Sequence, residues 1–307
     1  SQTFTFLEIQ MAYSNLVGNT PLVNISPNVW AKMEAYNPTG SIKDRMVHYV
    51  LSGAIKNKKI KKGDVVVEAT SGNTGISLSF FGQIEGIKIK IVMPSNMSEE
   101  RKQMMRYFGA EIIEVAAGDF DAAIAVRDKL AKEKGWYNFN QFHEKKNMEC
   151  HYVTTGNEIV RQVEDIFGFT EYCPTLIEAI VLGTGTGGTL MGAGKRIKEN
   201  YPNAKIVAVE PAESPVMSGG EAGLHGIQGI GDGSKFLVDL DKVDEVITIS
   251  TKDAENKARE LAAKGFFVGI SSGANVLAAE EWVEKNNPRG SVITILCDRG
   301  ERYMSIL

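Results

Sequence analysis

A stretch of small and hydroxyl-bearing residues, ATSGNTG at positions 69–75, lies between two short apolar runs. If the first run is a strand and the second a helix, the turn between them exposes backbone N–H groups beside the hydroxyls of Thr70, Ser71 and Thr74. Such a turn can bind a carboxylate or a phosphate. An ordinary N-capped helix with a glycine-rich entry has the same spacing, so the spacing alone leaves both interpretations open.

A second glycine-rich turn, GTGTGGT at positions 183–189, follows the apolar run IEAIVL. Its glycines let the backbone wrap an anion, and its threonine hydroxyls add donors. Glycines at 183, 185 and 188 also satisfy GxGxxG, and Glu210 imitates the acidic residue of a dinucleotide fingerprint. A nicotinamide-dependent oxidoreductase is therefore an alternative, and so is a tight turn without a ligand.

Lys43 lies in the turn-rich segment NPTGSIKDR, at positions 37–45, just inside an expected helix. Most lysines in such places are solvated surface groups. However, positive charge is disfavoured near a helix start, and this favours the neutral amine that a Schiff base needs. The segment GISSGAN at 269–275 is another small-residue turn before a helix and, taken singly, indicates only an N-cap.

Taken together, NPTGSIKDR, TSGNTG, GTGTGGT and GISSGAN, in this order, resemble the motifs of the cysteine synthase and cystathionine β-synthase family of fold-type II pyridoxal phosphate (PLP) enzymes. DRGERY near the C-terminus fits as well, and the resemblance extends from about Asn15 to the end. It implies PLP as the cofactor and a fold like that of the tryptophan synthase β subunit. It weakens the nicotinamide alternative, which requires neither Lys43 nor the TSGNTG turn.

The resemblance also implies roles for individual residues. Lys43 would form the internal aldimine and later act as acid and base at the substrate α-carbon. Asn73 would hydrogen-bond the phenolic oxygen of the cofactor, and Ser272 would face its pyridine nitrogen. The cofactor phosphate would be held by Gly185, Thr186, Gly187, Gly188 and Thr189. The substrate carboxylate would be bound by Thr70, Ser71, Thr74 and Gln141.

The chemistry that this resemblance implies is β-elimination and β-replacement on L-cysteine or O-acetyl-L-serine through an aminoacrylate, with hydrogen sulfide released or consumed. A serine opposite the pyridine nitrogen does not hold a proton there as a carboxylate would, and this favours loss of a β-leaving group over transamination. Serine and threonine dehydratases look similar, but they typically have SFKxRGA around the lysine. Here Asp44 and Arg45 follow Lys43 instead.

Asp232, in QGIGDG, departs from the family pattern, because typical cysteine synthases have a small apolar residue there. A solvated loop aspartate is one interpretation. In the other, its carboxylate orients or deprotonates a water and disfavours hydrosulfide. The enzyme would then convert L-cysteine and water to L-serine and hydrogen sulfide. Biosynthesis of cysteine from O-acetylserine and sulfide is the alternative.

The elements that must position these residues form an alternating pattern of strands and amphipathic helices. This pattern predicts an α/β protein made of two lobes of twisted, mostly parallel sheets covered by helices. Strands are expected at residues 65–68, 88–93, 111–115, 177–182, 205–209, 245–249 and 291–297. The expected domains are residues 11–45 plus 153–307, which anchor the cofactor, and a smaller mobile domain of residues 46–152. Residues 1–10 are expected to be an extension.

Composition excludes several classes of function. Thirty-four basic and thirty-eight acidic residues give a net charge of −4, which argues against a nucleic-acid partner. Three cysteines without a CxxC pair and four scattered histidines predict neither disulfides nor a metal site. No apolar run is long enough for a membrane helix. We therefore expect a cytoplasmic enzyme of small amino-acid substrates, and the resemblance implies a homodimer.

Overall fold

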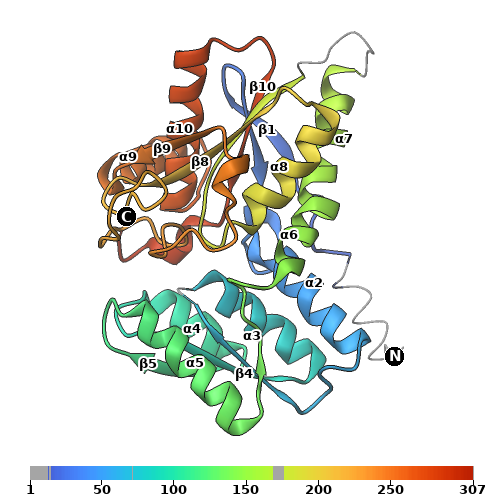
Figure 1. Ribbon diagram of the computed structural model, residues 1–307, viewed down its shortest axis with the longest axis vertical. Coiled ribbons are helices and arrows are strands. Elements are labelled where there is room, and N and C mark those ends of the chain that lie inside the picture. The colour runs from blue at the N-terminus through green and yellow to red at the C-terminus, as the bar shows by residue number, and fades with distance from the viewer. Residues whose placement is uncertain (1–12, 14, 71, 169–175, 307) are drawn as a thin grey trace. The chain divides into compact units, whose positions relative to one another are not determined.

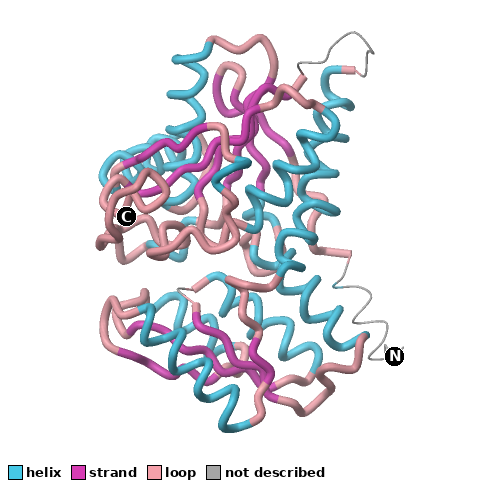
Figure 2. The backbone as a smooth tube through the Cα atoms, viewed as in Figure 1, coloured by secondary structure: helices cyan, strands magenta, loops and turns pink. Residues whose placement is uncertain are grey.

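The computed structural model describes residues 13, 15–70, 72–168 and 176–306. These residues form two compact units, and each is built on a largely parallel sheet with helices on both faces (Figures 1 and 2). The predicted α/β class is confirmed. None of the described helices is long and apolar enough to cross a lipid bilayer.

The first unit comprises the described residues up to Asn19 together with Asn37–Glu144. Its four strands are all parallel and lie in the order β5-β4-β3-β6. They are β3 (Val65–Ala69), β4 (Lys88–Pro94), β5 (Glu111–Val115) and β6 (Tyr137–Asn138). The two central strands are mostly buried, as expected for a parallel sheet that is covered on both faces.

Four helices cover this sheet: α2 (Lys43–Lys56), α3 (Asn73–Glu85), α4 (Glu99–Tyr107) and α5 (Phe120–Lys134). Alternation along β3 separates two apolar clusters, because Val66 packs with α2 and α3 whereas Val67 packs with α5. Asp119 caps α5 by accepting a hydrogen bond from the amide of Ala122. Because β3 and β6 are parallel neighbours, their carboxyl ends lie side by side at the same end of the sheet.

The second unit comprises Thr20–Tyr36 and the described residues from Lys145 onward. Its six strands lie in the order β1-β2-β10-β7-β8-β9, and only the pair β1–β2 is antiparallel. They are β1 (Leu22–Ser26), β2 (Val29–Met33), β7 (Ile177–Gly183), β8 (Lys205–Pro211), β9 (Glu245–Ile249) and β10 (Ser291–Leu296).

Helices α9 and α10 lie on one side of this sheet, and α7 and α8 lie on the other (Figure 1). Val207 and Val209 of β8 pack into the cluster beneath α9 and α10. Ile206, which points to the opposite face of the strand, contacts α8 at Gly194. The helices of this unit are α6 (Lys145–His151), α7 (Asn157–Phe167), α8 (Gly188–Asn200), α9 (Thr251–Ala263) and α10 (Ile270–Asn286). A π-helical turn, Tyr152–Gly156, joins α6 to α7.

The two units divide the chain at other residues than the sequence suggested. The expected large domain contained residues 11–45, but only Thr20–Tyr36 belongs to the second unit, because β2 pairs with β10. Residues 37–45 lie in the first unit, where α2 packs against α3. Residues 145–152 belong to the second unit, because α6 packs against α8. The mobility of the smaller unit stays a prediction.

Candidate functional site

The TSGNTG turn, which contains Asn73 and is called the asparagine turn below, lies at the carboxyl end of β3 in the first unit. The amide of Thr70 donates to the carbonyl of Val92 on β4, and its hydroxyl accepts a hydrogen bond from the amide of Gly72 at 3.1 Å. Helix α3 then begins at Asn73, so the turn joins a strand to a helix N-terminus as the sequence predicted. Ser71 lies outside the described residues.

Gln141 is brought to the same turn by the chain that leaves β6. Its side-chain oxygen accepts a hydrogen bond of 2.6 Å from the hydroxyl of Thr74, and its Nε2 donates to the carbonyl of Ala69. The structure therefore places Thr70, Thr74 and Gln141 together, and all three are buried. Loops at the carboxyl edge of a parallel sheet are a common place for ligands in α/β proteins.

Lys43 begins α2, which packs against α3 in the same unit. The buried carboxylate of Asp44 accepts hydrogen bonds from the amide and the hydroxyl of Thr39, at 2.6 and 2.5 Å. It accepts a third from the hydroxyl of Ser77, one turn into α3, at 2.5 Å. Asp44 thus joins the first turns of α2 and α3, which begin with Lys43 and Asn73.

The glycine-rich turn lies at the carboxyl end of β7 in the second unit and leads into α8. Gly187 is the N-cap of α8 and has a positive φ of 85°, which side chains rarely adopt. A Cβ on Gly185 would lie 2.5 Å from the carbonyl oxygen of Gly229, and one on Gly188 would overlap the amide of Asn147. The turn therefore requires glycine for space as well as for conformation.

Two residues on α6 support this turn, and sequence reasoning missed both. Asn147 donates a hydrogen bond of 2.9 Å to the hydroxyl of Thr186, and Nε2 of His151 lies 3.2 Å from the hydroxyl of Thr189. They lie about 40 residues before the turn, so no local pattern pointed to them. The π-helical turn that follows α6 is a feature often found near functional sites, and it was not predicted either.

Ser272 lies in the first turn of α10 and is fully buried. Its hydroxyl accepts a hydrogen bond of 2.9 Å from the amide of Cys297, just beyond the carboxyl end of β10. Since a hydroxyl both accepts and donates, its proton remains available for an acceptor. An unprotonated pyridine nitrogen is such an acceptor.

Asp232 lies beside the glycine-rich turn of its own unit. Its Oδ2 is 3.5 Å from the position that a Cβ on Gly185 would take. The loop that carries it is tied to the turn because the amide of Gly231 donates to the carbonyl of Thr184. His225 also contacts this loop, with Nε2 2.9 Å from the carbonyl oxygen of Gly231. The carboxylate therefore lies near the predicted phosphate-binding residues of the second unit.

Glu210 does not serve as the acidic residue of a dinucleotide site. Its carboxylate accepts hydrogen bonds from the amides of Met217 and Ser218, at 2.7 and 2.9 Å, and from the hydroxyl of Ser218 at 2.6 Å. The residue thus stabilises the loop after β8. The acidic residue that a dinucleotide site requires is thus engaged elsewhere, and this argues against a dinucleotide-binding role for the GxGxxG spacing.

Each unit, taken by itself, offers donors that suit a part of PLP. In the second unit, threonine hydroxyls and the first amides of α8 suit a phosphate group. The backbone there is packed so closely that no Cβ fits at Gly185 or Gly188. Ser272 has a hydroxyl that can donate a hydrogen bond to a pyridine nitrogen. Lys43 and Asn73 stand at two adjoining helix N-termini, where an amine and an amide can meet an aldehyde and a phenolic oxygen.

Replacing Gly188 by alanine should weaken PLP binding by at least about tenfold, because the new methyl group overlaps Asn147 and forces the turn apart. Titrating the apoprotein with PLP measures this. Gly135→Ala is the control, since its φ of 67° costs stability but nothing lies within 4 Å of the added Cβ. Equal PLP affinity in Gly188→Ala and the wild type would contradict the assignment of the turn.

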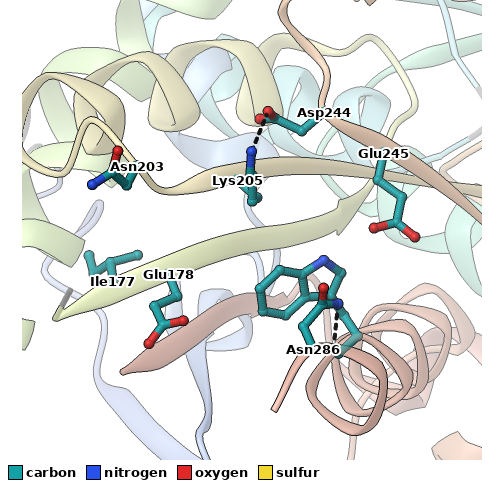
Figure 3. A pocket seen from close by; sticks show the side chains of 8 residues that line it. Ile177, Glu178, Asn203, Lys205, Asp244, Glu245 and Asn286 are labelled. Carbon is teal, nitrogen blue, oxygen red and sulfur yellow. Dashed lines mark hydrogen bonds and ion pairs between the residues drawn. The ribbon is translucent and has the colours of Figure 1, made fainter. Parts of the chain in front are cut away.

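A pocket of about 350 Å³ lies at the amino ends of the strands of the six-stranded sheet, which is the end opposite the glycine-rich turn (Figure 3). Lys205 there forms an ion pair with Asp244. None of the predicted site residues is among the described residues that line it, namely Ile177, Glu178, Asn203, Lys205, Asp244, Glu245, Trp282 and Asn286. In the described part of the chain, no cluster of three or more His, Cys, Asp or Glu could hold a metal ion.

Comparison with known proteins identifies the family. Residues 13–298 match the family described as "Pyridoxal-phosphate dependent enzyme". A cysteine synthase of Staphylococcus aureus is 38% identical over 95% of this chain and 94% of its own length. Cysteine synthase B of Campylobacter jejuni is 40% identical over 97% of this chain and 98% of its own.

Solved structures agree with these relatives. A hydrogen sulfide-producing enzyme from Fusobacterium nucleatum is 42% identical and covers 97% of this chain and 91% of its own, with a TM-score of 0.89. A D232N mutant of a hydrogen sulfide-producing enzyme, complexed with an α-aminoacrylate intermediate, has the same identity and coverage and a TM-score of 0.90.

Proposed function

Because the chain belongs to the pyridoxal-phosphate dependent enzymes and is cysteine synthase-like, we propose that it catalyses β-elimination and β-replacement on L-cysteine or O-acetyl-L-serine. PLP, its cofactor, supplies an electron sink that stabilises negative charge at the substrate α-carbon. Residues of the chain must then hold the cofactor, bind the substrate, move protons and select the incoming nucleophile.

The proposed cofactor-binding residues divide by the part of PLP that each contacts. Gly185, Thr186, Gly187, Gly188 and Thr189 hold the phosphate; Ser272 donates to the pyridine nitrogen; Asn73 bonds the phenolic oxygen; and Lys43 bonds to the aldehyde. The hydrogen bond from Cys297 to Ser272 supports this, because it uses the serine oxygen as an acceptor and leaves the hydroxyl proton available to donate. A neutral donor leaves the ring less electron-withdrawing than a carboxylate would, so loss of a β-leaving group competes better.

Lys43 is the proposed acid and base at the substrate. With the cofactor bound, its amine would remove the α-proton while the β-carbon loses its leaving group, and it would return a proton to the α-carbon after the nucleophile has added. Thr70, Ser71, Thr74 and Gln141 bind the substrate carboxylate. The hydrogen bonds of Gln141 to Thr74 and Ala69 support this, because they fix its side-chain amide at the turn while Nε2 keeps a second N–H to donate.

We further propose that the enzyme runs in the sulfide-releasing direction. L-cysteine loses its α-proton and hydrosulfide, a water adds its oxygen to the β-carbon, and Asp232 accepts the proton of that water. Lys43 returns a proton to the α-carbon, and the proton taken up by Asp232 passes to the released hydrosulfide, so the products are L-serine and hydrogen sulfide. The observation that carries this proposal is the carboxylate of Asp232, 3.5 Å from the Cβ position of Gly185. A hydrogen sulfide-producing enzyme at 42% identity supports it.

Biosynthesis of cysteine from O-acetylserine and sulfide is the second candidate. The relatives from S. aureus and C. jejuni, which bear the name cysteine synthase, favour it. The two directions share the same first half, the loss of a β-leaving group, and differ in whether water or hydrosulfide adds. The nicotinamide-dependent oxidoreductase is not supported, because the family is PLP-dependent and Glu210 binds its own loop.

Isotopic labelling distinguishes the two directions. The PLP-loaded enzyme is supplied with L-cysteine in ¹⁸O-labelled water, and serine and sulfide are measured. We expect equal amounts of sulfide and of serine that carries ¹⁸O at its hydroxyl. If cysteine yields no serine while O-acetylserine and sulfide yield cysteine rapidly, the enzyme works in the biosynthetic direction.

We also propose a cytoplasmic homodimer, and light scattering on the purified protein tests the dimer.

A further inference from the structure

Glu68 and Arg127 form a buried ion pair in the first unit, directly behind the asparagine turn. Arg127 Nη1 lies 2.9 Å from Glu68 Oε1, and the two side chains are 2% and 0% exposed. Arg127 also contacts Asp128 at 2.9 Å. Removing two charges from water is costly, and a buried pair often stabilises a protein no more than apolar residues of the same size. The pair therefore invites a functional explanation.

The Glu68 carboxylate holds two segments that carry proposed substrate-binding residues. Its Oε1 accepts a hydrogen bond of 2.7 Å from the amide of Ala69, where the turn begins. Its Oε2 accepts one of 2.8 Å from the amide of Gln141, which follows β6. One carboxylate thus bridges two backbone segments that lie 72 residues apart.

The bridged residues continue into the proposed carboxylate site. Gln141 donates from its side chain to the carbonyl of Ala69 at 3.1 Å and accepts from the Thr74 hydroxyl at 2.6 Å. The backbone of Gln141 is fixed by Glu68, and its side chain is fixed by the turn. A shift of the Gln141 backbone would therefore displace both its own side-chain amide and the hydroxyl of Thr74.

An ionised Glu68 is the strongest acceptor for these hydrogen bonds, since a protonated carboxyl has lost its charge and part of its acceptor capacity. Burial raises the pKa of Glu68, and the nearby Arg127 guanidinium acts in the opposite direction, as do the amides of Gln141 and Ala69. Arg127 is the cation that counters the cost of burying the charge. Without it, the pKa of the Glu68 carboxyl would rise further, and protonation would weaken its hold on the two amides.

We propose that Glu68 and Arg127 are positioning residues, which set Gln141 and Thr74 in the geometry that binds the α-carboxylate of the amino-acid substrate. The proposal rests on the proposed function for the identity of the substrate. It predicts that the ion pair governs substrate affinity rather than the rate of the bond-breaking steps, because Glu68 acts through the backbone amides of Ala69 and Gln141, and Arg127 acts through Glu68.

The test compares Arg127→Met and Arg127→Lys with the wild-type holoenzyme. In Arg127→Met we expect KM for L-cysteine to rise about tenfold, as for loss of one hydrogen bond to a charged group, with kcat within about threefold of wild type. L-alanine, which has no leaving group, should bind about tenfold more weakly by the change in cofactor absorbance. Amide hydrogen exchange should become faster at residues 139–144. Arg127→Lys should restore most of the affinity, because it keeps the charge.

Arg106→Met is the matched control, since Arg106 is exposed on α4 of the same unit and should change none of these measurements. A lower melting temperature with unchanged KM and unchanged L-alanine affinity would overturn the proposal and leave the pair a structural element. If Arg127→Met does not fold, Glu68→Gln, which removes the carboxylate, provides the same readouts, and Arg127→Lys remains the variant that keeps the charge. Failure of L-cysteine as a substrate would count against the proposed function alone, because L-alanine binding and hydrogen exchange require no turnover.

Discussion

Replacing Lys43 by alanine should lower turnover of either substrate by at least about 10⁴-fold and remove the covalent attachment of PLP to the chain. Loss of a general acid and base alone costs about 10² to 10⁴-fold, and Lys43 has in addition the proposed role of bonding to the cofactor. The structure supports this choice among the lysines of α2. Only Lys43 stands at its first residue, beside the carboxylate that joins α2 to α3.

Two measurements check this result. Steady-state assays with L-cysteine and with O-acetylserine plus sulfide give the loss of turnover. Borohydride reduction followed by peptide mass spectrometry shows whether PLP becomes fixed to the peptide that contains residue 43. Lys56→Ala, at the last residue of the same helix, is the matched control and should keep both activity and labelling. Labelling of another lysine in the wild type would contradict the assignment.

Strands could be predicted from the sequence wherever apolar residues follow one another, and this includes the partly buried β5 and β9. β3, β4, β7 and β8 are runs of apolar residues that are buried on both faces, and each begins at the predicted residue. The β1–β2 hairpin was missed, because β2 contains Lys32, which is fully buried. Its charge is neutralised by Glu158 on α7, at 2.6 Å. No local pattern shows a lysine whose partner is 126 residues away.

The site divides in the same way. The strand–turn–helix setting of the asparagine and glycine-rich turns could be predicted, because each motif is local and its geometry follows from a few consecutive residues, whereas the roles of their residues stay predictions. What supports the motifs was not identified. Asn147 reaches Thr186 across 39 positions, and Arg127 reaches Glu68 across 59. These contacts exist only after the sheets have formed, so a single sequence gives no period or spacing from which to infer them.

Replacing Asp232 by asparagine should reduce formation of serine and sulfide from L-cysteine by about 10² to 10⁴-fold, the usual contribution of a general base. Asparagine has the same size and can still orient a water, but it cannot accept the water's proton. Formation of cysteine from O-acetylserine and sulfide should be unchanged or faster, because hydrosulfide already carries a negative charge and needs no base. Removing the carboxylate also removes repulsion between it and this anion.

The ratio of the two activities is the decisive quantity, because damage to folding or to PLP binding lowers both and leaves their ratio unchanged. We expect the ratio to shift by at least about 100-fold toward biosynthesis in Asp232→Asn. Asp241→Asn, at an exposed aspartate nine positions later, should leave it unaltered. If serine forms equally well in Asp232→Asn and wild type, water needs no carboxylate at this position. Asp232 would then be a loop residue that lies beside Gly185 without acting on the substrate.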